Sequence, residues 1–177
     1  MLCRLIDGFS NVLGHAGRVA IFVLIGAMLF EVVARYVFGS PTLWAFDVSY
    51  MLNGSIFLLG AAYALRKDAH VRIDFLSQQM PLRLQQRLNG AVYLLVMAPL
   101  FFAFTWIAAR KAHKAFVTGE VESVSPWAPL VWPFYGVIAL GLLALSLQFV
   151  SEALKYLSGR KSPHAPEGEL ETAGQDQ

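Results

Sequence analysis

The chain has 177 residues, of which 56% are hydrophobic and only 15% are charged. Soluble domains carry about 25% charged residues, so this deficit, with the charges bunched between apolar runs, indicates a membrane protein. The net charge of +2 is too small to indicate a nucleic-acid partner. Cys3 is the only cysteine, which excludes an intrachain disulfide.

The first apolar run covers residues 19–38 and predicts the first membrane span. Before it, residues 1–17 repeat apolar side chains at helical spacing, which predicts an amphipathic lead-in at the membrane interface. The run has no clear small-residue cleavage site, so we expect it to remain as an uncleaved anchor. Glu31 and Arg35 lie four residues apart on one helix face and can pair.

A turn at residues 39–41 separates the first span from the second, which is predicted at residues 43–65. The turn brings Arg35 and Asp47 to the same depth. Ionisable groups at membrane depth are functional candidates by default. We favour the simpler interpretation, a structural ion pair at the end of this hairpin that includes Glu31.

The second span carries small and polar residues at regular intervals. Asn53, Gly60 and Ala64 recur at spacings of seven and four, with Phe57 between them. This pattern predicts a packing face where another helix can approach closely.

A charged segment follows, from Arg66 to Arg87. Ile73, Leu76 and Met80 form an apolar stripe, and Asp74 is a plausible helix N-cap. We therefore predict a short interfacial amphipathic helix at residues 74–80, which ends before Pro81.

The third span is predicted at residues 88–109, with a kink at Pro99. Residues 110–124 read as a polar connection. The fourth span is predicted at residues 130–151, with a regular helix beginning near Pro133. Together, residues 1–157 predict a single four-helix membrane domain, and residues 158–177 predict a disordered tail.

Lysine and arginine positions predict the orientation. With the N-terminus inside, ten of these residues lie on the inner side and four on the outer side, which favours an N-in, C-in topology with the interfacial helix on the cytoplasmic side. The same topology places four tryptophans near the outer face. They form either an ordinary aromatic belt or a surface for an extracytoplasmic partner, and they are Trp44, Trp106, Trp127 and Trp132.

Sites for chemistry are not evident in the sequence. The histidines are scattered, no metal-ligand spacing appears, and no nucleophile stands beside a base. We therefore expect no metal or cofactor site and no catalysis.

Two linked motifs carry a family resemblance. Residues 35–44 read RYVFGSPTLW, with Asp47 three residues on, and residues 60–66 read GAAYALR, followed by HVRIDFL at 70–76. In this order and spacing they resemble the small membrane subunit, the DctQ-like small permease, of tripartite ATP-independent periplasmic (TRAP) transporters.

The resemblance implies a division of labour within a complex in the bacterial inner membrane. A large membrane subunit would carry the organic acid and the sodium ions, and a periplasmic receptor would deliver the substrate. This chain would scaffold the large subunit in a symport system without binding sodium itself. Arg66, His70, Arg72 and Asp74 would then form an assembly element that also contacts membrane lipids.

Two other functions remain open at this stage. A self-sufficient exporter of the small multidrug type would need a buried mid-membrane acid, for which Glu31 is the candidate. A membrane anchor subunit of a redox complex would need haem or quinone ligands, and the histidine positions argue against it.

Overall fold

A computed structural model of the chain describes residues 2–67 and 81–158. The elements are α1 (Leu2–Tyr36), α2 (Ala45–Arg66), α3 (Leu82–Val92), the π-helical turn η2 (Tyr93–Met97), α4 (Ala98–Thr118) and α5 (Trp132–Leu157). Because α3, η2 and α4 follow one another without a break, they form one long rod. Four helical rods result, and each is long and apolar enough to cross a membrane. The predicted all-α architecture with four spans is therefore confirmed.

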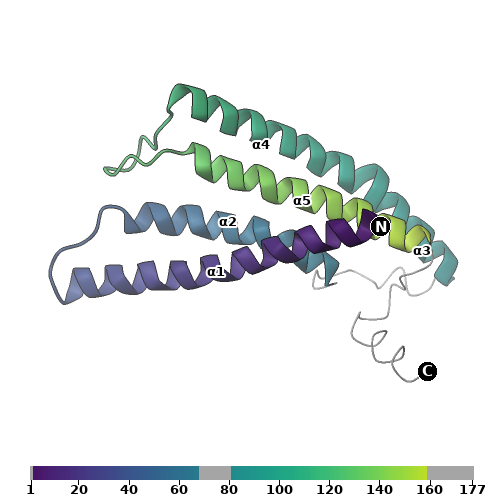
Figure 1. Ribbon diagram of the computed structural model, residues 1–177, viewed down its shortest axis with the longest axis horizontal. Coiled ribbons are helices and arrows are strands. Elements are labelled where there is room, and N and C mark those ends of the chain that lie inside the picture. The colour runs from purple at the N-terminus through teal and green to yellow at the C-terminus, as the bar shows by residue number, and fades with distance from the viewer. Residues whose placement is uncertain (1, 68–80, 159–177) are drawn as a thin grey trace, which may run out of the picture.

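The rods form two antiparallel hairpins that lie side by side (Figure 1). One hairpin is α1 with α2, the other is α4 with α5, and α2 packs against α5. We call the end with the connections 37–44 and 119–131 the loop end. The opposite end, where α1 begins and α5 stops, is the terminal end.

Glycines allow the helices to approach closely. A Cβ atom on Gly141 of α5 would lie 2.8 Å from Leu58 Cβ and 3.0 Å from the Leu58 carbonyl oxygen. On α1, a Cβ on Gly14 would lie 2.8 Å from the Tyr63 ring. Small residues at helix crossings are typical of membrane bundles. The buried core between the rods consists of Leu13, Leu59, Ala62, Leu65, Ala98, Ala144, Leu145 and Phe149.

The predicted amphipathic lead-in is not a separate element. Residues 2–17 are the first turns of α1, which runs as one helix to Tyr36. Their apolar side chains face two ways: Ile6 is 8% exposed and Leu13 is 6% exposed, whereas Leu5 is 65% exposed and Val12 is 66% exposed. One part of this apolar surface therefore packs against protein, and the predicted location at the membrane interface stays a prediction.

The third rod differs from its prediction in two ways. In place of the kink expected at Pro99, the rod has a π-helical turn just before that residue. Proline has no N–H to donate, so it fits where the regular helical hydrogen bonding is interrupted. The polar connection expected at 110–124 was wrong in its first part, because α4 continues to Thr118. The helix stops only at Gly119, whose φ of 64° is left-handed.

Two predictions fall on residues outside the described ranges. These are the interfacial helix at 74–80 and the tail from residue 159. The fourth helix begins at Trp132 with Pro133 in its first turn, as predicted.

Candidate functional site at the two ends of the bundle

An ion pair at the loop end joins the last turns of α1. The Arg35 guanidinium donates from Nε and Nη2 to Glu31 Oε1, at 2.9 and 2.6 Å. The other carboxylate oxygen of Glu31 accepts from the backbone N–H of Thr42, at 2.9 Å, and from the Thr42 hydroxyl. Glu31 is thereby enclosed, whereas 55% of the Arg35 side chain stays exposed. The cluster ties α1 to the connection that leads into α2.

Asp47 lies in the first turn of α2 and links the two hairpins. Its carboxylate is buried and accepts a hydrogen bond from the Ser125 hydroxyl in the 119–131 connection. Ser125 Oγ also accepts from the Trp127 N–H at 3.1 Å. The described residues contain no ion pair between Asp47 and Arg35. The two groups lie at the same end, but Asp47 bonds to the other hairpin.

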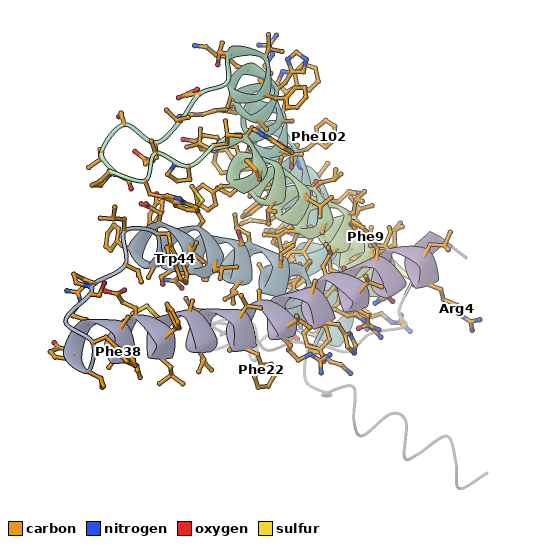
Figure 2. All side chains as sticks on the ribbon, turned by 60° about the vertical axis from the view of Figure 1, so that its left-hand side comes forward. Arg4, Phe9, Phe22, Phe38, Trp44 and Phe102 are labelled. Atoms are coloured by element: carbon orange, nitrogen blue, oxygen red, sulfur yellow. The ribbon has the colours of Figure 1, made fainter. Side chains whose placement is uncertain are left out.

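The four tryptophans all lie in the half of the bundle near the loop end. Trp44 stacks on Phe30, with ring centroids 5.8 Å apart, just before α2 begins (Figure 2). Trp106 of α4 is exposed beneath the Arg110 guanidinium, which lies 5.3 Å from its centroid. Trp127 and Trp132 lie in and after the 119–131 connection. This distribution suits an aromatic belt, and it also leaves aromatic surface for a partner.

The residues predicted as a helix-packing face point mostly outward. Asn53 is exposed, and a Cβ at Gly60 would meet nothing within 4 Å, while Ala64 is half-buried. The close contacts of α2 with α5 are made instead from Gly54 and Leu58. The predicted close approach of another helix at this face stays a prediction.

Only one member of the predicted cytoplasmic element can be placed. Arg66 ends α2, and its Nη1 donates to the Asp7 carbonyl at 3.3 Å. Its Nε is buried without a hydrogen-bond partner among the described residues. His70, Arg72 and Asp74 lie outside the described ranges, so their predicted roles stay predictions.

A second polar cluster, at the terminal end, was not expected from the sequence. Gln148 of α5 accepts from Ser10 at 2.7 Å and donates to Asp7 and to Glu152, both at 3.0 Å. Lys155 donates to Asp7 at 3.0–3.1 Å and to Glu152 at 2.8 Å. We call these five residues the terminal-end polar cluster. About two turns of α5 are thereby bonded to the beginning of α1.

This cluster is enclosed to an unusual degree for charged groups. Ser10, Gln148 and Glu152 are fully buried. A buried charge is tolerated when it is paired and its hydrogen bonds are satisfied, as they are here. Its sequence signal was present: Gln148, Glu152 and Lys155 fall on one face of an otherwise apolar helix. The partners Asp7 and Ser10 lie about 140 residues away, and no local pattern connects them.

The described residues differ from the ligand sets that hold metal ions. Within the described ranges, no group of three His, Cys, Asp or Glu side chains could hold a metal ion. The buried carboxylates are occupied by Arg35, Thr42, Ser125 or Lys155. A cavity of about 550 Å³ lies between α1 and α2, and its wall includes Leu24, Met28, Ser49 and Asn53.

Residues 24–159 match the family described as "Tripartite ATP-independent periplasmic transporters, DctQ component". The match covers most of the chain, with three complete rods and the last part of the first, from residue 24 onward. The chain belongs to this DctQ family. The resemblance of the two motifs is therefore confirmed.

Two relatives differ in how much of their own length this chain matches. The chain is 34% identical over 158 residues to the sialic acid TRAP transporter permease protein SiaT of Haemophilus influenzae, covering 89% of this chain but 24% of the relative. It is 25% identical over 143 residues to the sialic acid TRAP transporter small permease protein SiaQ of Vibrio cholerae, covering 78% and 79% of the two chains. The chain thus spans about a quarter of SiaT and most of SiaQ.

The family match covers the two ends of this DctQ protein to different extents. It includes Glu31, Asp47 and Ser125 at the loop end. At the terminal end it includes the α5 residues but begins after Asp7 and Ser10. The α1 half of the terminal-end polar cluster therefore lies outside the matched residues.

Proposed function

We propose that this chain is the small membrane subunit of a TRAP transporter in a bacterial inner membrane. It scaffolds a large membrane subunit that takes up an organic acid by ion-coupled symport, and a periplasmic receptor delivers the substrate. The membership of the DctQ family is the observation that carries the proposal. The inner side corresponds to the terminal end, because more of the described lysine and arginine residues lie toward it than toward the loop end.

The internal chemistry supports a scaffold instead of a carrier. In the described ranges, the buried carboxylates lie at the two ends of the rods and are already paired or hydrogen-bonded. A transport site would need polar groups free to coordinate a substrate near the middle of the membrane. We infer that sodium and substrate bind to the large subunit and that this chain catalyses no reaction.

The relative SiaT supports the expected partner. There, the matching region is joined to about three times its own length of further permease sequence in one chain. A region that is covalently part of a larger permease in one relative is expected to assemble with a separate one here.

The two alternative functions are less well supported. Glu31 bonds to Arg35 and Thr42 at the loop end, so it is not the isolated mid-membrane acid of a small multidrug exporter. For a redox anchor, the described histidines are unsuited as ligands: His15 bonds to the Asn11 carbonyl on its own helix and His113 is exposed.

Affinity purification tests the proposal. The chain is tagged at its C-terminus, expressed with its neighbouring genes and purified in mild detergent. A large multi-pass protein should co-purify, and radiolabelled organic acid uptake in proteoliposomes should require both proteins and the receptor. Uptake by the large protein and receptor at an undiminished rate without this chain would contradict the scaffold role, and a bound chromophore would favour the redox anchor.

A further inference from the structure

The outward face of α2 combines aromatic, small and polar residues. Six residues share this face, and we call them the α2 face: Phe46, Tyr50, Asn53, Phe57, Gly60 and Ala64. Phe46 is 80% exposed and Phe57 is 75% exposed, and the position above Gly60 is open. Small residues such as Gly60 and Ala64 allow the backbone of a partner helix to approach closely.

Asn53 lies at the centre of this face, near the middle of α2. Its side chain is exposed and makes no hydrogen bond within the described part of the chain. At this depth lipid offers no hydrogen-bonding group, so an amide facing acyl chains would lose the bonds that it makes in water. Polar side chains within spans therefore generally face protein.

The exposed faces of α1 and α4 provide the contrast. At residues 19–33 of α1 and at residues 92–109, which run from the end of α3 through η2 into α4, every exposed residue is apolar. Phe22 and Phe102 represent these faces, and both point away from the bundle (Figure 2). Acyl chains can cover these apolar surfaces without leaving a hydrogen-bonding group unpaired, but they offer no hydrogen-bonding group to the Asn53 amide.

The cavity between α1 and α2 opens beside the α2 face. Asn53, Phe46 and Tyr50 line it together with Leu24 and Met28 of α1. At about 550 Å³ it can accept side chains from a neighbouring helix. A helix lying on the α2 face would thus reach both the Asn53 amide and this cavity.

We infer that the α2 face binds one transmembrane helix of the large membrane subunit. A hydrogen-bonding side chain of that helix pairs with the Asn53 amide, and its apolar side chains fill the cavity between α1 and α2. The inference rests on the proposed function. The relative SiaT favours this occupant, because there a matching region shares one chain with additional permease sequence.

Photocrosslinking tests the location of the interface. The full-length chain is co-expressed with the large subunit, with p-benzoylphenylalanine in place of Phe57, or of Phe22 as a matched control. Both side chains are 75% exposed, so exposure alone predicts equal reactivity. Irradiation should attach the large subunit at position 57 and not at position 22. An adduct with a second copy of this chain at 57, or adducts of equal yield at both positions, would overturn the inference.

Substitution tests the role of the amide. Asn53→Leu should reduce recovery of the large subunit about fivefold, the scale of an interhelical polar contact, whereas Phe22→Leu should not. The isolated Asn53→Leu chain should elute and unfold like wild type, since Asn53 makes no internal hydrogen bond. Undiminished recovery with Asn53→Leu would overturn the pairing. Failure of the wild type to recover a large subunit would contradict the proposed function itself, so the two failures are distinguishable.

Discussion

The two ends of the bundle are held by polar groups in different ways. At the loop end, Glu31 bonds to residues four and eleven positions away, and Arg35 remains more than half exposed. At the terminal end, groups on α5 that are mostly or fully buried bond to residues 138–148 positions away on α1. The loop end fixes the first connection and joins the hairpins by the Ser125–Asp47 hydrogen bond, whereas the terminal end joins α1 to α5 by several hydrogen bonds and ion pairs. Stability should therefore depend more on the terminal end.

Lys155→Met should produce the largest loss of stability. The substitution keeps the length of the side chain but removes the ammonium group that pairs with the Asp7 and Glu152 carboxylates. Removing one member of a buried ion pair costs about 3 kcal/mol or more. SDS-induced unfolding of the purified chain, followed by circular dichroism, measures the change. Lys114→Met, at an exposed position of α4, is the matched control, and equal effects of the two substitutions would contradict the difference between the ends.

Ser10 and Gln148 should behave as a coupled pair. Gln148→Leu leaves buried partners of the amide unsatisfied, at about 1–3 kcal/mol, and Ser10→Ala removes a bond to the same amide. A double-mutant cycle should give a coupling energy of about 1 kcal/mol. Additive effects would show that the 2.7 Å contact does not contribute to holding α1 against α5.

Ser125→Ala should have a smaller and more local effect. It removes the hydrogen bond to buried Asp47 and with it the link between the two connections at the loop end. Hydrogen exchange should quicken in residues 119–131 while the rods stay protected. Ser123→Ala, at an exposed position in the same connection, is the control. Uniformly faster exchange in all rods would mean that the loop end also holds the hairpins together.

The difference between local and long-range contacts also explains which features could be predicted from the sequence. The four spans, the turn at Gly39 and the spacing of Glu31 and Arg35 are local patterns, and local physical chemistry is sufficient to find them. The terminal-end polar cluster depends on Asp7 and Gln148, which meet only after α1 has packed against α5. For the same reason, periodicity identifies the apolar side chains of residues 2–17 but not which of them pack against protein.

The charged residues at 110–118 show how a local pattern misplaced a helix end. Arg110, Lys111 and Lys114 were read as a connection because charge was taken to end the helix. Long basic side chains are good helix formers, and here they extend α4 beyond the apolar region. Lys111 Nζ lies 4.6 Å from the centroid of the Tyr135 ring on α5, so a charged turn still packs in the hairpin. The helix end was set by Gly119 and not by polarity.

Arg35→Gln should give the smallest loss of stability among these substitutions. The Arg35 side chain is more than half exposed, and exposed ion pairs contribute little because water and salt screen them. Glu31 would keep both bonds from Thr42. We therefore expect a decrease in the thermal midpoint smaller than that of Thr42→Val, which removes the hydroxyl donor to the enclosed carboxylate oxygen. Measuring both variants by differential scanning fluorimetry in the same detergent tests the order. If Arg35→Gln were the more damaging of the two, the ion pair itself, and not the threonine bonds, would hold the first hairpin connection.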